Sequence, residues 1–168
     1  NEHWMPFTSN KDFKANPRLI TEAKGVYLKT HHGKTQIDAS SGLFCNPLGH
    51  GRKEITEAVT KQLDTLDYAQ PFQQGFGGSF ELASKIAKHT PGDLNKMFFT
   101  ICGSTAVETA IKIAVAYHRA KGDAQRFRFV GRERGYHGMN IGCVSVGGMV
   151  NNVKTFASIL MPGVQHIR

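Results

Sequence analysis

Residues 96–138 decide the fold: they read K-M-F-F-T-I-C-G-S-T-A-V-E-T-A-I-K-I-A-V-A-Y-H-R-A-K-G-D-A-Q-R-F-R-F-V-G-R-E-R-G-Y-H-G. The apolar run at 96–100 is typical of a buried strand. Residues 106–121 are predicted to form a helix, because apolar side chains recur on one face, and Gly122 suits its end. A second strand is expected at 127–130. Strand, helix and strand in this order make a βαβ unit, so we expect an α/β fold with a parallel sheet.

The turn that opens the predicted helix is the first candidate site. A helix N-terminus offers unpaired backbone N–H groups and the positive end of the helix dipole. Gly103 allows a ligand to approach the backbone, and Ser104 and Thr105 add hydroxyl donors, so the turn can hold one phosphate group. Capping of the helix by Ser104 or Thr105 is the competing interpretation. The turn contains neither G-x-G-x-x-G nor G-x-x-x-x-G-K-[ST], so a dinucleotide fold or a P-loop is not supported.

The second candidate site is the loop Gly135-Tyr136-His137-Gly138, which follows the second predicted strand. Ligands of open α/β sheets lie at the carboxyl ends of the strands, so we expect this loop beside Ser104. An aromatic side chain flanked by glycines can lie against a planar ring. A tyrosine packed on the surface is the alternative. A phosphate site beside an aromatic platform is what pyridoxal phosphate needs.

The first part of the chain has a different organisation. Residues 1–24 show no sustained period and are expected to be an irregular lead-in. The runs V-Y-L-K-T and T-Q-I-D-A, at 26–30 and 35–39, predict a hairpin outside the parallel sheet. Helices are expected from about Arg52 and from Ser79, with Ser79 as the N-cap of the second.

Composition excludes several classes of protein. The net charge of +8 comes from scattered residues, so we expect no nucleic-acid partner. Three cysteines are too few for a disulfide framework or a zinc site, which favours a reduced, cytoplasmic protein. No apolar stretch reaches the roughly 18 residues of a membrane span, so no membrane partner is expected. His31 and His32 are interpreted as a turn pair, and no metal site is predicted.

Longer motifs carry a resemblance to a known family. They include H-W-M-P-F-T-S-N-K-D-F-K-A-N-P-R-L at 3–19, S-G-L-F-C at 41–45, G-H-G-R-K-E-I at 49–55, G-S-T-A-V-E-T-A-I-K-I-A at 103–114 and G-R-E-R-G-Y-H-G at 131–138. The chain resembles a class III, fold type I aminotransferase and is most similar to the omega-amino acid:pyruvate (β-alanine:pyruvate) aminotransferases. This implies that residues 1–72 contribute to the small domain. Residues 73–168 would then begin the large parallel-sheet domain that binds pyridoxal 5'-phosphate, and leave it incomplete.

The resemblance implies a role for each residue of the two candidate sites. Gly103 and Ser104 would hold the phosphate of pyridoxal 5'-phosphate. Thr105 stands where the family usually has an acidic residue, which leaves its part in phosphate binding open. Tyr136 would stack on the pyridine ring, with His137 beside it.

The resemblance also implies a substrate pocket and a reaction. The pocket would be lined by Leu43, Phe44, Phe72 and Tyr136, with Phe72 reaching the partner subunit's site in a homodimer. The reaction would move an amino group from an ω-amino acid such as β-alanine to pyruvate. Taurine, a diamine or an aromatic amine is an alternative donor, and a non-catalytic phosphate-binding module is an alternative of another class.

The catalytic lysine is the part of the family chemistry that these residues do not supply. In the family, the lysine that forms the Schiff base with the cofactor lies downstream of the stretch that this chain resembles. No catalytic residue is therefore assigned within residues 1–168, and the chain alone is expected to be an inactive N-terminal fragment.

Overall fold

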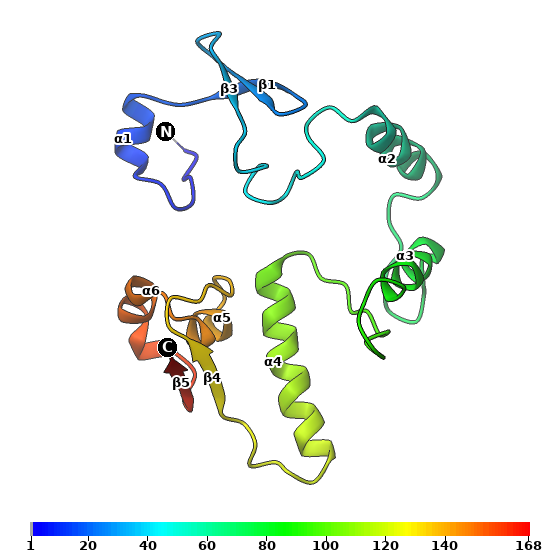
Figure 1. Ribbon diagram of the computed structural model, residues 1–168, viewed down its shortest axis with the longest axis vertical. Helices are drawn as coiled ribbons and strands as arrows, with labels where there is room; N and C mark the ends of the chain where they lie inside the picture. Colours follow the sequence, from blue (N-terminus) through cyan, green and yellow to red (C-terminus); the bar gives the residue numbers. More distant parts are fainter. Residues whose placement is uncertain (1) are drawn as a thin grey trace. The chain divides into compact units, whose positions relative to one another are not determined.

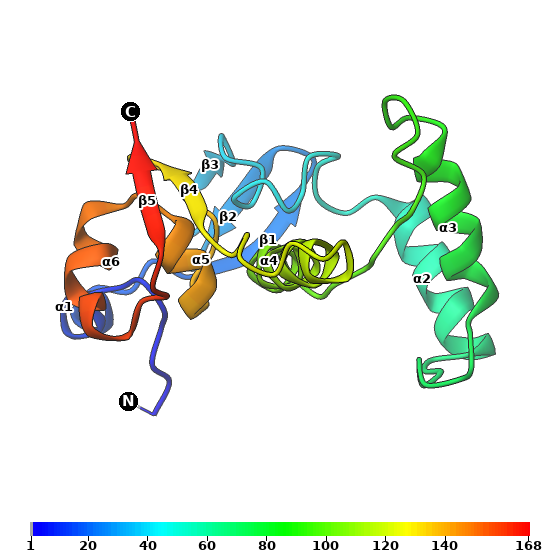
Figure 2. The same cartoon turned by 90° about the horizontal axis from the view of Figure 1, so that it is seen from below.

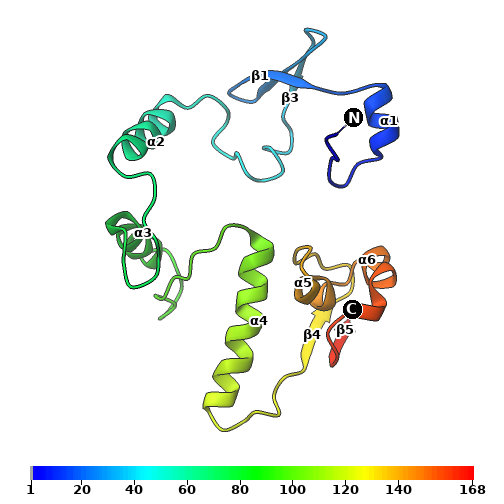
Figure 3. The ribbon, with the colours of Figure 1, turned by 180° about the vertical axis from the view of Figure 1, so that it is seen from behind.

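The computed structural model describes residues 2–168 and divides into two compact units that meet between Phe76 and Gly77. Figures 1 and 3 show the order of the elements in each unit. The first unit contains α1 (Asn10–Ala15), β1 (Ile20–Lys24), β2 (Tyr27–Thr30), β3 (Thr35–Ile37) and α2 (Lys53–Thr65). The second unit contains α3 (Gly77–Ala87), α4 (Gly103–Ala120), β4 (Phe129–Arg132), α5 (Ile141–Val146), α6 (Val150–Thr155), the 3-10 helix Ala157–Ile159 and β5 (Val164–Ile167).

An antiparallel sheet in the order β1-β2-β3 organises the first unit. β2 pairs with β3 so that Tyr27 lies opposite Ile37, which confirms the predicted hairpin. β1 pairs on the other side of β2, with Lys24 opposite Tyr27. Figure 2 shows these three strands together. They form a sheet of their own, separate from the parallel pair of the second unit.

The irregular lead-in expected for residues 1–24 is wrong at α1 and at β1. α1 follows Ser9, whose hydroxyl donates to Asp12 Oδ2 at 2.6 Å. The Asn10 side chain ties the helix to Met5, accepting its N–H at 2.8 Å and donating to its carbonyl at 2.9 Å. Every residue of β1 is exposed, so the strand has no buried face in the described chain. Its pairing with β2 defines it as a strand.

The two helices on either side of the unit boundary differ in how well their starts were predicted. α2 begins directly after Arg52, as expected. α3 begins at Gly77, so Ser79 lies inside the helix and the prediction that it is the N-cap is wrong. The glycines before Ser79 join the helix, so it starts three residues before Phe80, the first helical residue that an N-cap at Ser79 implies. Neither helix has a buried residue within the described chain.

A parallel strand pair forms the centre of the second unit. Phe129 of β4 lies opposite Val164 of β5, and Arg132 lies opposite Ile167. The two arrows run in the same direction in Figure 2, with α5 and α6 in the connection between them. Since a helical crossover joins two parallel strands, β4–α5–α6–β5 is a βαβ unit. Its core lies on α5, where Cys143 is fully buried.

The strand predicted at 96–100 does not form among residues 2–168. Phe98 is 72% exposed there and Phe99 is 46% exposed. An apolar run becomes a strand only when a neighbouring strand satisfies its backbone groups, and none does so in the described chain. The strand expected at 127–130 forms two residues later as β4, and its partner is β5. The parallel sheet is confirmed, but its βαβ unit uses other elements than expected.

Candidate functional site

The first turn of α4 presents the backbone groups that were predicted to bind an anion. α4 begins at Gly103, three residues before the expected start, with Cys102 as the N-cap. The first hydrogen bond of the helix runs from the Ala106 N–H to the Cys102 carbonyl at 3.0 Å. The N–H groups of Gly103, Ser104 and Thr105 precede that bond, so they have no partner in the helix ladder. The prediction that Gly103 and Ser104 lie at a helix N-terminus is confirmed.

Gly103 has no steric reason to be glycine within the described chain. A Cβ built on it would meet no atom within 4 Å, and its φ lies outside the left-handed region. Glycine in the middle of a helix costs roughly 0.5–1 kcal/mol relative to alanine, and this is the upper limit for Gly103 at the first position of α4. The space beside Gly103 is therefore open to a group from outside residues 2–168.

The loop that carries Tyr136 lies directly against the start of α4. The Met139 N–H donates to Ser104 Oγ at 3.1 Å. Gly138 has a φ of 121°, and a Cβ on it would lie 2.8 Å from the Ser104 Cα. Only glycine fits there, because the backbone conformation and the close approach both exclude a side chain. The expectation that the two candidate sites are neighbours is confirmed.

Cys143 and Glu108 connect α5 to the start of α4. The fully buried Cys143 Sγ lies 3.1 Å from the Ser104 carbonyl oxygen and 3.6 Å from Glu108 Oε2. Burial, followed by the negative charge of Glu108, raises the pKa of the Cys143 thiol, which keeps it protonated. A Cβ on Gly142 would lie 2.6 Å from Glu108 Oε2. Sequence reasoning missed these residues, although the small residues of I-G-C-V-S-V signal a closely packed helix.

Thr105 and Cys102 interact at the exposed edge of the same turn. The Thr105 hydroxyl lies 3.3 Å from Cys102 Sγ. This contact, and then the backbone N–H groups of Thr105 and Ser104, lower the pKa of the Cys102 thiol. No side chain caps α4 and its N-cap is Cys102, so the interpretation of Ser104 or Thr105 as the cap is wrong.

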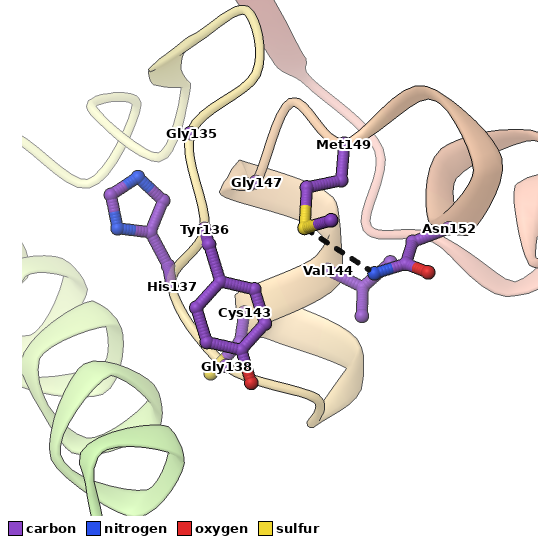
Figure 4. A pocket seen from close by; sticks show the side chains of 9 residues that line it. All are labelled: Gly135, Tyr136, His137, Gly138, Cys143, Val144, Gly147, Met149 and Asn152. Atoms are coloured by element: carbon purple, nitrogen blue, oxygen red, sulfur yellow. Dashed lines mark hydrogen bonds between the residues drawn. The ribbon is translucent and has the colours of Figure 1, made fainter. Parts of the chain in front are cut away.

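Tyr136 forms one wall of a small pocket with a cavity volume of about 10 Å³, room for no more than one water molecule. Figure 4 shows its ring over α5, while the His137 ring extends to the other side of the loop. Tyr136 is 60% exposed, so a face of its ring is available to a ligand. Asn152 Nδ2 lies 3.9 Å from Met149 Sδ at the opposite wall. The lining residues are Gly135, Tyr136, His137, Gly138, Cys143, Val144, Gly147, Met149 and Asn152.

Leu43, Phe44 and Phe72, the other residues predicted to line a substrate pocket, belong to the first unit. They are 73%, 84% and 79% exposed. Leu43 and Phe44 lie in a left-handed turn, Ser41–Phe44, with φ values of 51°, 58°, 56° and 68°. The Phe44 N–H closes this turn by donating to the Ser40 carbonyl at 3.0 Å. A left-handed conformation costs about 1–2 kcal/mol for each residue other than glycine. The common pocket of these residues with Tyr136 stays a prediction.

Between residues 2 and 168, no group of three or more His, Cys, Asp or Glu side chains is arranged to hold a metal ion. No helix in that range is long and apolar enough to cross a membrane.

Comparisons with known proteins identify relatives of the whole chain. The sequence model of the family described as aminotransferase class-III matches residues 8–168. An omega-aminotransferase of Caulobacter vibrioides is 47% identical over 164 residues, which are 98% of this chain and 37% of the relative. A β-alanine–pyruvate aminotransferase of Pseudomonas aeruginosa is 48% identical over 158 residues, which are 94% of this chain and 35% of the relative.

A solved structure gives the same result for the fold. The omega transaminase from Pseudomonas jessenii, in complex with PMP, superimposes with a TM-score of 0.93 at 29% identity and covers 98% of this chain and 37% of that chain. The superposition confirms the predicted fold class. The chain spans little more than a third of the length of the relatives that it matches.

Proposed function

This chain belongs to the class III aminotransferases, and from that membership we propose that the whole protein transfers an amino group from an ω-amino acid such as β-alanine to pyruvate. The relative named for β-alanine and pyruvate supports this donor and acceptor, because its match extends over nearly the whole chain at high identity. Pyridoxal 5'-phosphate is the cofactor of this class of enzyme. When bound, it supplies the electron sink for bond breaking at the amino-bearing carbon.

The phosphate of the cofactor is proposed to bind at the start of α4, on Gly103 and Ser104. Three observations support the fit. The first N–H groups of the helix precede its hydrogen-bond ladder. The space beside Gly103 is open. The Ser104 hydroxyl accepts the Met139 N–H, which leaves its own hydrogen free to donate to a phosphate oxygen. Thr105 bonds to Cys102, so its part is proposed to be the support of the turn.

Tyr136 is proposed to stack on the pyridine ring, with His137 beside it. The exposed face of Tyr136 supports this assignment, as does the contact of its loop with Ser104. Gly138 allows the loop to approach α4 so closely that a ring and a phosphate can be held by neighbouring backbone segments. In this arrangement the protein orients the cofactor through α4 and excludes water from one ring face through Tyr136.

The substrate pocket is proposed to combine Leu43, Phe44, Phe72 and Tyr136. The exposure of the three first-unit side chains is consistent with surfaces that other parts of the protein cover. We further propose a homodimer in which Phe72 reaches the partner subunit's site. Residues 1–72 would contribute to the small domain, and residues 73–168 would begin the large cofactor-binding domain.

The observation that carries the proposal is the glycine at position 103, open to a ligand and next to the Tyr136 loop. The test is to purify the whole protein with pyridoxal 5'-phosphate and measure alanine formation from pyruvate with β-alanine, taurine, a diamine and an aromatic amine. We expect alanine formation with β-alanine and the visible absorbance of bound cofactor. Bound cofactor with no alanine from any donor would refute the reaction, and faster turnover with another donor would replace β-alanine.

A further inference from the structure

Asp38 and His50 close the base of the loop 39–49. Asp38 directly follows β3, and its N–H donates to the Val26 carbonyl at 2.8 Å. His50 is fixed by two backbone hydrogen bonds with Gly25, at 2.8 and 2.9 Å. Between these fixed points, Asp38 Oδ2 lies 2.9 Å from His50 Nε2. The two ends of the loop are therefore joined through side chains and anchored through the backbone.

The other carboxylate oxygen of Asp38 reaches into the left-handed turn Ser41–Phe44. Oδ1 accepts the Gly42 N–H at 3.0 Å and the Ser40 hydroxyl at 3.3 Å. The Asp38 side chain is 7% exposed, so water competes little for these bonds. The Gly42 N–H, followed by His50, holds the pKa of Asp38 below its ordinary value, which keeps the carboxylate charged. One carboxylate thus links the turn to His50.

The turn needs such support because its conformation is unfavourable for an isolated chain. Three of its four residues carry side chains, and left-handed backbone persists for such residues only where the surroundings fix it. Leu43 and Phe44 are exposed, so packing in the described chain contributes little. The bonds that fix the turn are its own backbone hydrogen bonds and the contact with Asp38.

We propose that Asp38 and His50 are positioning residues that hold the turn Ser41–Phe44 and so determine where Leu43 and Phe44 meet the amino donor. This inference rests on the proposed function, which assigns those two side chains to the substrate pocket. Asp38 and His50 act through the turn and do not touch the donor. Their loss should therefore change the discrimination between small and bulky donors more than it changes cofactor binding.

The test compares three variants of the whole protein. Asp38→Ala removes every contact of the carboxylate. Asp38→Asn keeps an oxygen for the Gly42 N–H and offers an N–H to His50 Nε2, so it should rescue the turn. Glu22→Gln is the matched control, because Glu22 forms an exposed ion pair with Lys29 on the same sheet.

Two measurements are made on each variant: kcat/KM for β-alanine and for 1-phenylethylamine with pyruvate, and hydrogen exchange of residues 40–46. We expect Asp38→Ala to change the ratio of the two kcat/KM values by about tenfold or more and to accelerate exchange of the Gly42 and Phe44 amides by about tenfold. Asp38→Asn should stay within about threefold of wild type in the same ratio, and Glu22→Gln should match wild type.

The outcomes separate this inference from the proposed function. An equal loss of kcat/KM for both donors would overturn it, because a folding defect lowers the activity with every donor alike. Unchanged exchange in Asp38→Ala would overturn it as well. Wild-type protein that transaminates no donor would instead overturn the proposed function, and the exchange measurement would still decide whether Asp38 holds the turn.

Discussion

Gly103→Ala should separate a ligand-binding role of Gly103 from a structural one. A Cβ at this position would meet no atom within 4 Å, so the substitution should raise the free energy of unfolding by at most roughly 0.5–1 kcal/mol, the value for the middle of a helix. The methyl group would occupy the space proposed for the cofactor phosphate. Loss of one hydrogen bond to a charged group costs about 1.5–3 kcal/mol, so the Kd for pyridoxal 5'-phosphate should rise about 10- to 150-fold.

The matched control for this prediction is Gly77→Ala. Gly77 is the first residue of α3, and a Cβ on it would also meet nothing within 4 Å. It should therefore gain the same stability and leave the Kd unchanged. Urea unfolding gives the stability of the whole protein, and cofactor titration followed by absorbance gives the Kd. Equal Kd values for Gly103→Ala and Gly77→Ala would refute the phosphate assignment. A loss of stability in Gly103→Ala would show that protein atoms fill the space.

Gly138→Ala should lower the free energy of unfolding by about 2–5 kcal/mol in urea, because its φ of 121° and its approach to the Ser104 backbone both exclude a side chain. Gly122→Ala, with a φ of 84° and no atom within 4 Å of the added Cβ, should lower the free energy of unfolding only by the cost of its backbone conformation. Tyr136→Ala should weaken cofactor binding by about 0.5–1.5 kcal/mol, as measured by dialysis, and Tyr136→Phe should weaken it much less. If wild type and Tyr136→Ala retain the cofactor equally, Tyr136 only packs against the protein and does not stack on the cofactor. The pKa of Asp38 is held below its ordinary value, so its carboxylate stabilises the fold above the ordinary pKa, and this stabilisation is lost as pH falls through the lower, folded-state pKa. The stability difference between wild type and Asp38→Ala should therefore be constant at neutral pH and shrink in acid, as measured by urea unfolding across that range.

Local signals were sufficient to predict the parts of the site that depend on few neighbours. The start of α4 followed from a glycine and two hydroxyl residues ahead of an amphipathic run, and its position was wrong by only three residues. The Tyr136 loop followed from glycines placed after a strand. The contact between the two was expected from the rule that ligand sites gather at the carboxyl ends of parallel strands, and the bond from Met139 to Ser104 confirms it.

Pairing between distant segments was the part that sequence patterns could not predict. The apolar run at 96–100 reads as a better strand than β5, yet β5 pairs with β4, because a ladder partner decides which extended segment becomes a strand. β1 was not predicted, for the opposite reason. The polar residues of I-T-E-A-K interrupt the alternation of apolar and polar side chains that marks a strand, and the pairing with β2 is what makes the segment a strand. Neither outcome is encoded in the local composition of the segment concerned.

The glycines of the second unit show why the structure, in addition to the sequence motif, is needed to assign a binding site. Gly131 and Gly138 are required by neighbouring protein atoms, whereas Gly103 is not. A Cβ on Gly131 would run into the Val146 carbonyl oxygen, and one on Gly138 into Ser104. Gly103 is bounded by nothing in the described chain, although it begins an 18-residue helix in which alanine would be the more stable choice. A glycine that packing in the described chain does not require, at the start of a long helix that also contacts the Tyr136 loop, supports our proposal that the cofactor phosphate binds at this turn.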